Sequence, residues 1–331
     1  MNWPRSFLSD VQIMRIAILT TGGDAPGMNA AIRAVVRRAL SFGWEVWGIE
    51  RGFQGMFEDD FHRMDHGSVS GIINHGGTIL KTLRCPGFRE EEFRRECYRK
   101  LNQRQIEGLV VIGGDGSLAA CRATFSETGM PISFVPASID NDIAGTDETI
   151  GFDTAVNTAL DAIDKIRDTA TSHERVFLTE VMGREKGFLA LEVGLAAGAE
   201  IILVPEIPFR TEEILAQFLE GRKKGKRSMI AVVAEGAAEV STLAKEIQVG
   251  YPGEVRYSIL GYVQRGGAPS ARSRHLAFLF GARAVEALAQ DKGAFFVGLE
   301  ANKVVTRNLL DACEKKELDR EIFRLAHILA A

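Results

Sequence analysis

The chain has 331 residues, enough for about two domains of roughly 150 residues each, which excludes the small scaffolds that depend on disulfides or metals. Its formal net charge of −4 excludes a global basic surface for DNA or anionic membranes, so any polyanion must be bound locally. Apolar residues make up 46% and charged residues 25% of the chain, close to the globular average, which argues against long disordered regions.

Cysteine usage and hydropathy favour a cytoplasmic protein. Short Cys/His spacings do not occur, so neither a zinc site nor a disulfide framework is expected from Cys85, Cys97, Cys121 and Cys313. The most apolar stretch, residues 188–205, is interrupted by Glu192 and Glu200 and is not expected to span a membrane. Residues 1–13 lack the pattern of a secretory signal, and we interpret them as an N-terminal extension because Met14 directly precedes the first predicted strand.

Short β-branched apolar runs alternate with helical patterns, which is typical of a parallel sheet covered by helices. The first clear helix is predicted from about residue 28 to a C-cap at Gly43, and a later one covers about residues 154–171. Nine apolar runs are predicted strands, which suggests an α/β fold with two sheets: residues 15–19, 45–49, 109–112, 132–135, 176–181, 201–204, 229–233, 257–260 and 295–298.

Two strand-to-helix loops have similar compositions. Residues 22–27 read Gly-Gly-Asp-Ala-Pro-Gly, residues 113–117 read Gly-Gly-Asp-Gly-Ser, and each loop opens a predicted helix. Glycines let the backbone approach a phosphate, and the helix N-terminus supplies N–H donors. One such loop alone could be a tight turn, but two at equivalent positions favour phosphate cradles. Neither loop matches the Walker A or the GxGxxG pattern.

A third loop, residues 138–142, places the carboxylates of Asp140 and Asp142 in alternate positions after the next strand. Such a pair can divide the labour of holding a metal and accepting a proton, although an Asx-turn is the plainer alternative. Because ligands bind at the carboxyl ends of parallel strands, we expect Asp115 to share one crevice with this pair. The combination favours phosphoryl transfer assisted by Mg²⁺.

Several arginines flank loops, where guanidinium groups could bind phosphates. Arg184 and Arg265 have glycine neighbours and are the least ordinary, whereas an isolated arginine is usually solvated. Phe53 could stack on a nucleobase or simply pack within a turn. His173 and His275 are expected to be structural or exposed. The complete set of such arginines is Arg84, Arg89, Arg175, Arg184, Arg256 and Arg265.

Five motifs then identify a family. They are GGDAPGMNAAIR, IGGDGS, IDNDIAGTD, EVMGR and GYVQRGG, which begin at residues 22, 112, 139, 180 and 261. From Met14 to about residue 316 the chain closely resembles bacterial ATP-dependent 6-phosphofructokinases. The resemblance implies phosphoryl transfer from MgATP to the 1-hydroxyl of fructose 6-phosphate in glycolysis, by a homotetramer whose active sites are shared between subunits.

The resemblance also implies two Rossmann-like three-layer domains with largely parallel sheets. Residues 14–151 plus 264–315 would form the ATP- and Mg²⁺-binding domain, and residues 152–263 plus 316–331 the sugar-phosphate-binding domain. No nucleic acid or membrane partner is implied.

Site roles follow from the matching positions. Asp140 takes the role of catalytic base, with Ser138, Arg184 and Arg84 also in the catalytic set, and Mg²⁺ would be held by Asp115 and Asp142. The ATP side comprises Gly23, Phe53, Arg84, Cys85, Gly114, Asp115, Gly116 and Ser117. The sugar-phosphate side comprises Ser138, Asp140, Asp142, Arg175, Met182, Gly183, Arg184, Glu235, Arg256, Tyr262 and Arg265. Within that set, Arg175 and Arg256 would be donated to the neighbouring subunit.

The phosphate donor can also be argued. Pyrophosphate-dependent relatives usually carry an Asp and a Lys where this chain has Gly116 and Ala137, and an Asp at residue 116 would crowd and repel the nucleotide's α-phosphate, so ATP is favoured. Ser138 replaces the usual Thr and keeps its hydroxyl. Tyr262 replaces the usual His, which puts a neutral phenol where a potentially cationic donor is expected.

An effector site that binds ADP or phosphoenolpyruvate in relatives is only partly matched. His66, Gly67 and Ser228 replace an Arg, a Tyr and a His, so we expect a weak response to those ligands. The positions that do match are Arg33, Arg37, Arg167, Glu200, Lys224 and Lys226.

Three functions remain open from the sequence. They are the fructose 6-phosphate kinase, a pyrophosphate-dependent or other sugar-phosphate kinase, and a catalytically silent nucleotide sensor. The intact Asp115, Asp140 and Asp142 argue against the sensor, because a sensor needs no base.

Overall fold

The computed structural model describes residues 13–311 and 316–330, and this part of the chain forms two compact units. Unit 1 contains residues 13–138, Ile143–Gly151, residues 265–311 and Lys316. Unit 2 contains Ile139–Asp142, Phe152–Gln264 and residues 317–330. The domain boundaries predicted from the sequence differ from these units mainly at Ile139–Asp142, which the contacts between residues group with unit 2. Residues 1–12 of the predicted extension, and Cys313, lie outside the described residues.

Unit 1 is built on a mixed sheet in the order β12-β11-β5-β4-β1-β2-β3, with β6 paired to β5. The central strands are parallel, whereas β3 and β12 run antiparallel at the two edges. Its strands are β1 (Arg15–Thr21), β2 (Glu45–Ile49), β3 (Phe61–Met64), β4 (Gly108–Gly113), β5 (Ile132–Ser138), β6 (Ile150–Gly151), β11 (Ala294–Glu300) and β12 (Lys303–Asn308).

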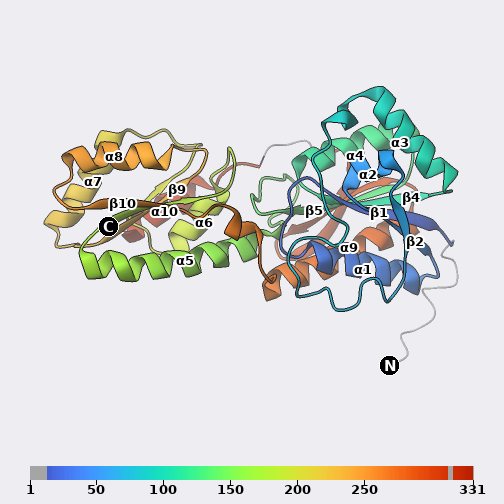
Figure 1. Ribbon diagram of the computed structural model, residues 1–331, viewed down its shortest axis with the longest axis horizontal. Helices are drawn as coiled ribbons and strands as arrows, with labels where there is room; N and C mark the ends of the chain where they lie inside the picture. The colour runs from blue at the N-terminus through green and yellow to red at the C-terminus, as the bar shows by residue number, and fades with distance from the viewer. Residues whose placement is uncertain (1–12, 312–315, 331) are drawn as a thin grey trace. The chain divides into compact units, whose positions relative to one another are not determined.

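Helices cover both faces of this sheet (Figure 1). Helices α1 and α9 pack together on one face, and α2, α3 and α4 cover the other. Helix α1 begins at the predicted residue and ends just before Gly43, whose φ of 77° suits a C-terminal cap. The helices of unit 1 are α1 (Met28–Ser41), α2 (Gly52–Glu58), η2 (Pro86–Arg89), α3 (Glu91–Gln103), α4 (Asp115–Thr128) and α9 (Ala271–Gln290).

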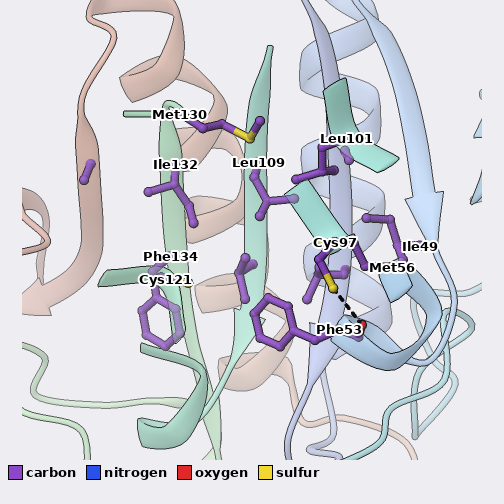
Figure 2. Close-up of a cluster of buried hydrophobic side chains, with 14 of the residues drawn as sticks. Ile49, Phe53, Met56, Cys97, Leu101, Leu109, Cys121, Met130, Ile132 and Phe134 are labelled. Carbon is purple, nitrogen blue, oxygen red and sulfur yellow. Dashed lines mark hydrogen bonds between the residues drawn. The ribbon is translucent and has the colours of Figure 1, made fainter. Parts of the chain in front are cut away.

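A hydrophobic core lies between the sheet and helices α2 to α4 (Figure 2). Leu109, Ile132 and Phe134 project from β4 and β5 into this core, where they are fully buried. The Sγ of Cys97 lies 3.8 Å from the carbonyl oxygen of Phe53, and burial raises the pKa of Cys97 to about 12. Cys97 is therefore a neutral packing residue at physiological pH. The three described cysteines are all free thiols.

Unit 2 has a fully parallel sheet in the order β10-β7-β9-β8. Helices α7 and α8 cover one face and contribute to its core, and α5 and α6 cover the other (Figure 1). The strands are β7 (Val176–Val181), β8 (Ile201–Leu203), β9 (Met229–Ala234) and β10 (Val255–Ile259). The helices are α5 (Phe152–His173), α6 (Phe188–Ala196), α7 (Thr211–Lys223), α8 (Val240–Gly250) and α10 (Arg320–Ala330), and the short helix η3 (Gly261–Arg265) belongs to unit 2 except for its last residue.

The α/β class and the two sheets are confirmed, and every predicted strand has a counterpart. The sequence reading missed β3, β6 and β12. Strand β12 reads Lys-Val-Val-Thr-Arg-Asn and is an exposed edge strand, so it lacks the continuous apolar run of a central strand. Within the described ranges, no helix is both long enough and apolar enough to cross a membrane.

Candidate active site

The two glycine-rich loops of unit 1 are neighbours because β1 and β4 pair in parallel, with Thr21 opposite Gly113. The hydroxyl of Ser117 donates to the carbonyl of Thr21 across a distance of 3.2 Å. A Cβ placed on Gly22 would lie 3.4 Å from that hydroxyl oxygen, and Gly22 itself has a φ of 90°. The first loop therefore needs glycine here for both its conformation and its closeness to the second loop.

The second loop leaves open space above the start of α4. Helix α4 begins at Asp115, which is exposed, and a Cβ on Gly114 or Gly116 would meet no atom within 4 Å. The amide of Ser117 bonds back to Gly114, whereas the amides of the first helical residues have no i−4 carbonyl in the helix. Open backbone at a helix N-terminus is the arrangement that accepts phosphate groups.

Arg265 packs against the first loop. Its guanidinium occupies the place where a Cβ on Gly23 would lie, and its Nη1 is 3.8 Å from the Asp24 carboxylate. The side chain is only 11% exposed, and its Nε is buried without a hydrogen-bond partner in the described part of the chain. A largely buried guanidinium with one long ion pair retains donors for an anionic ligand. Arg265, which the resemblance assigns to the sugar-phosphate side, lies within this chain beside the first glycine-rich loop of unit 1.

The segment that carries Arg84 and Cys85 is tied to the same loop, since the hydroxyl of Thr82 donates to the carbonyl of Gly22 at 3.0 Å. Arg84 is exposed and forms no ion pair with any described residue. Cys85 is partly buried, its Sγ lies 3.6 Å from the Gln54 side-chain oxygen, and burial raises its thiol pKa. Arg84 is thus available to a phosphate, whereas Cys85 is a neutral neighbour.

The prediction that Phe53 stacks on a nucleobase is wrong, because the ring is buried. Its side chain is 3% exposed and lies in the core of unit 1 (Figure 2), and its ring stacks on Phe88 with the centroids 4.0 Å apart. The physical reason is that an aromatic ring gains more from burial than from exposure at a turn. The structure therefore supports the plainer alternative, in which Phe53 is a packing residue of the core.

In unit 2, Asp140 pairs with Arg184. The carboxylate Oδ2 lies 3.2 Å from the guanidinium Nε, and the Asp140 side chain is 2% exposed while that of Arg184 is 47% exposed. Two residues of this pair's loops, Asn141 and Arg184 itself, have φ values of 52° and 55°, which non-glycine residues adopt rarely. Strained backbone of this kind concentrates at functional sites. The pair thus joins a buried carboxylate to a cation that still faces solvent.

Glu235 holds the loop after β7 in place. Its Oε1 accepts hydrogen bonds from the backbone amides of Gly183 at 3.1 Å and Arg184 at 2.5 Å. The buried side chain of Gln264 accepts from the Met182 amide at 3.4 Å and donates to the Gly261 carbonyl at 3.0 Å. Because Glu235 directly follows β9 and Gln264 lies in η3, two segments distant in the chain fix the Met182–Gly183–Arg184 loop. Sequence reasoning gave Glu235 a substrate role and missed Gln264.

Glu180 lies near this loop, and its pKa is raised above the ordinary value. Burial is the largest cause, followed by the charges of Glu235 and Glu239. Glu239, in contrast, caps α8 by accepting from the amides of Ser241 and Thr242, and hydrogen bonds to their hydroxyls and amides lower its pKa to about 2. The loop after β7 therefore lies in a negatively charged neighbourhood, which Arg184 partly offsets.

Arg175 and Arg256 lie at the opposite end of β7. Both pair with the Glu254 carboxylate, and Arg175 is the main cause of the lowered pKa of Glu254. Arg175 immediately precedes β7, and Arg256 pairs in register with the second residue of that strand. The loop containing Arg184 follows the strand, so about seven extended residues, roughly 23 Å, separate the two groups. Within one chain these arginines do not reach Asp140.

The remaining predicted residues are distributed as follows. Ser138 ends β5 in unit 1, and its carbonyl accepts from the Thr149 hydroxyl at 2.6 Å. Asp142 is partly buried and belongs to unit 2, whereas Asp115 belongs to unit 1. Tyr262 is 82% exposed on η3. Across the described ranges, the structure contains no group of three or more His, Cys, Asp or Glu side chains able to hold a metal ion.

The six predicted effector residues are divided between the units. Arg33 and Arg37 lie on α1, where Arg33 donates to the Val69 carbonyl at 2.8 Å and its pKa is lowered by burial and by Arg37. In unit 2, the other four surround the segment after α6. Arg167 donates to the Ala197 carbonyl at 2.7 Å, and Glu200 accepts from the Ile230 amide at 2.8 Å. Lys226 lies 3.7 Å from Glu200, and Lys224 is exposed.

Comparisons with known proteins agree with this architecture. The sequence profile of the phosphofructokinase family matches residues 15–288. A protein of Thermotoga neapolitana named ATP-dependent 6-phosphofructokinase is 48% identical over 319 residues, which cover 96% of this chain and 99% of that protein. One of the same name from Listeria welshimeri is 50% identical over 317 residues, with the same coverage of both chains.

A solved structure shares the fold. Phosphofructokinase from Saccharomyces cerevisiae is similar with a TM-score of 0.83 and 35% identity, over 90% of this chain but only 45% of the yeast chain. This chain therefore spans less than half of that longer relative, whereas it matches the bacterial relatives along nearly their whole length. On these matches, the chain belongs to the phosphofructokinase family.

Proposed function

We propose that this protein transfers the terminal phosphoryl group of ATP to the 1-hydroxyl of fructose 6-phosphate, giving ADP and fructose 1,6-bisphosphate. The observation that carries the proposal is the Asp140–Arg184 pair at 3.2 Å. A carboxylate held in one position is a group that can accept the proton of an attacking hydroxyl. Relatives about 50% identical along the whole chain, named ATP-dependent 6-phosphofructokinase, support the reaction type.

In this proposal the carboxylate of Asp140 accepts the proton of the acceptor hydroxyl as that oxygen attacks the γ-phosphorus of ATP. Arg184 then stabilises negative charge on the transferred group, because its side chain is half exposed and its Nε already points to the reacting carboxylate. The Met182–Gly183–Arg184 loop would contact the sugar phosphate. The hydrogen bonds from this loop to Glu235 and Gln264 keep that contact surface rigid.

We assign the nucleotide to the two glycine-rich loops of unit 1. The empty volume at Gly116 favours ATP over pyrophosphate, since an Asp there would occupy space that an α-phosphate needs and would repel it. Cations for the phosphates come from Arg265 beside Gly23 and from Arg84, which has no ion-pair partner among the described residues.

Mg²⁺ is part of the proposal. Mg²⁺ commonly takes one or two protein carboxylates and completes its octahedron with phosphate oxygens and water, so it needs no cluster of three acidic side chains. Asp115 fits this requirement because it is exposed on the first turn of α4 beside open backbone. Asp142 is the second carboxylate proposed. When bound, the ion would neutralise phosphate charge, and the protein's residues would orient the substrates.

We further propose that the active oligomer, expected to be a tetramer, shares its sites between subunits. Arg175 and Arg256 lie at the far end of β7 from Asp140 in the same chain, so they serve a fructose 6-phosphate only on a neighbouring subunit. In the isolated chain both are held by Glu254, which keeps them ordered.

To test the proposal, the purified protein is assayed with each combination of a phosphate donor, ATP or pyrophosphate, and an acceptor, fructose 6-phosphate or one of several other sugar phosphates. The release of ADP or phosphate is followed. ATP with fructose 6-phosphate should give the highest kcat/KM. Faster transfer from pyrophosphate, or a clear preference for another sugar phosphate, would reassign the donor or the acceptor within the family. No turnover with any pair would favour a nucleotide sensor.

A further inference from the structure

A cavity of about 690 Å³ opens in unit 2 at the β8 edge of the sheet, beside the proposed effector lysines. Phe218 of α7 and Met229 of β9 give it an apolar part, and Glu200 and Lys226 give it a charged part. His327 and Ala330 of α10 also line it. The cavity therefore borders the chain's last described helix.

The C-terminal end of α10 holds Lys226. The ammonium Nζ donates to the carbonyl oxygen of Ala330 at 2.5 Å, and Glu200 lies 3.7 Å from the same nitrogen. Carbonyls in the last turn of a helix lack intrahelical partners and carry the negative end of the helix dipole. Helix α10 thus presents to Lys226 the same kind of group that an anionic ligand would present.

Helix α10 is only lightly anchored. It has 11 residues, and Ala326 is its single buried one. Ile328 and Leu329 are 70% and 68% exposed, and the helix packs on α6 and β8 alone among its main contacts. A helix that buries so little apolar surface opens locally at a small cost in free energy. Its contact with Lys226 can therefore exchange with another ligand of similar charge.

We propose that α10 is an internal competitor for anions at Lys226. When α10 is docked, its last turn fills the space next to the ammonium group and its dipole repels a phosphate; when α10 is released, Lys226 and Lys224 can bind the phosphate together. Phosphate binding and α10 docking exclude each other, so each lowers the apparent affinity of the other. The inference concerns unit 2 alone and does not depend on which reaction the protein catalyses.

Hydrogen exchange on the unaltered protein gives the first test. Inorganic phosphate should increase deuterium uptake in the peptide that covers residues 318–330, because it shifts α10 towards the released state. Helix α8, which does not line the cavity, is the internal reference and should not change. Unchanged or reduced uptake in α10 would overturn the proposal, since α10 would then be indifferent to the anion or would form a wall of its site.

A matched pair of variants gives the second test. Ala326→Glu places a charge in the one buried position of α10 and should undock the helix, whereas Leu329→Glu adds the same charge on the same helix at an exposed position. Phosphate affinity is measured by calorimetry as the component that Lys226→Gln abolishes. If α10 is docked for most of the time, Ala326→Glu should bind phosphate about fivefold more tightly than the parent protein does. The phosphate affinity of Leu329→Glu should differ little from that of the parent.

Equal or weaker phosphate affinity in Ala326→Glu than in Leu329→Glu would contradict the proposal. If Ala326→Glu fails to fold, Lys226→Gln supplies a further exchange test without added phosphate. Loss of the Lys226 contact should by itself raise deuterium uptake in α10. Uptake equal to that of the parent would show that this contact does not hold the helix, and the proposal would fail.

Discussion

The Nε of Arg184 lies 3.2 Å from the Oδ2 of Asp140, although the two residues are 44 positions apart in the chain (184 minus 140). Asp140 follows β5, Arg184 follows β7, and both loops contain a left-handed non-glycine residue. A left-handed backbone conformation costs free energy unless surrounding contacts enforce it. In the second loop Glu235 provides such contacts, because its carboxylate accepts hydrogen bonds from two backbone amides. The pair is therefore a preorganised feature of unit 2.

Replacement of the proposed base should remove turnover while binding is kept. Asp140→Asn keeps the shape of the side chain but cannot accept the hydroxyl proton, so kcat should fall by at least about 100-fold with little change in the KM for ATP. Asp168→Asn, the same exchange on the exposed face of α5, is the control and should keep parental kinetics. Near-normal kcat in Asp140→Asn would assign the base to another residue.

An Asp at residue 116 should damage nucleotide use without unfolding the protein. Because no atom lies within 4 Å of a Cβ at Gly116, Gly116→Asp should fold, yet its carboxylate would enter the space proposed for a phosphate. The KM for ATP should rise at least about tenfold, which is about 1.4 kcal/mol of lost binding. Ala119→Asp adds the same charge farther along α4 and should change the KM for ATP much less. Similar effects from both variants would point to general charge repulsion.

Subunit sharing predicts complementation between two defective chains. Asp140→Asn and Arg175→Ala should each have low activity at limiting fructose 6-phosphate. In a mixed pair of subunits, one site carries both defects and the other carries neither. Random mixing of equal amounts should therefore restore about a quarter of the parental activity, since about half of the pairs are mixed and one site in two is intact. Activity that stays at the average of the two separate variants would place both residues in the same subunit's site.

Two glutamates near the loop after β7 should change stability with opposite signs. The pKa of Glu239 is lowered from 4.5 to about 2 by its hydrogen bonds, so its stabilisation is present above pH 4.5 and is lost as pH falls towards 2. Glu239→Gln should lower the Tm at pH 7, by an amount that shrinks below about pH 5. The measurement is thermal unfolding from about pH 7 to about pH 3.5. A difference in Tm between Glu239→Gln and the parent that does not change with pH would mean that the carboxylate charge is not involved.

Glu180 provides the opposite case. Its pKa is raised by burial and by Glu235 and Glu239, so its ionised form opposes folding at neutral pH, and this cost disappears as pH falls through the raised pKa. Glu180→Gln should therefore raise the Tm at pH 7 and should match the parent in acid. A lower Tm at pH 7 would show that the Glu180 carboxylate stabilises the fold instead.

Local features of the site could be predicted from the sequence. The two glycine-rich loops are encoded by contiguous residues at strand ends, and the pairing of Thr21 with Gly113 brings them together as a parallel sheet requires. The strands and the boundary of α1 were predictable for the same reason, since apolar periodicity and a glycine cap are local signals.

Contacts between distant residues could not be predicted in this way. Neither composition nor spacing indicates that Glu254 holds Arg175 and Arg256, or that Gln264 supports Met182, because these contacts depend on tertiary packing. The role of Phe53 is also not decided by the sequence, because an aromatic residue near a glycine fits both a stacking platform and a core, and only its packing on Phe88 decides between them. The contact of Lys226 with Ala330 likewise spans 104 positions.

The most direct test of the central claim is a ³¹P NMR spectrum of the products formed from ATP, fructose 6-phosphate and Mg²⁺ by the purified protein. We expect ADP and a bisphosphorylated fructose with phosphates on C1 and C6 to appear in equal amounts, and both to form at least about 100-fold more slowly with Asp140→Asn. Release of free phosphate without a new sugar resonance, or phosphorylation at a different carbon, would contradict the account.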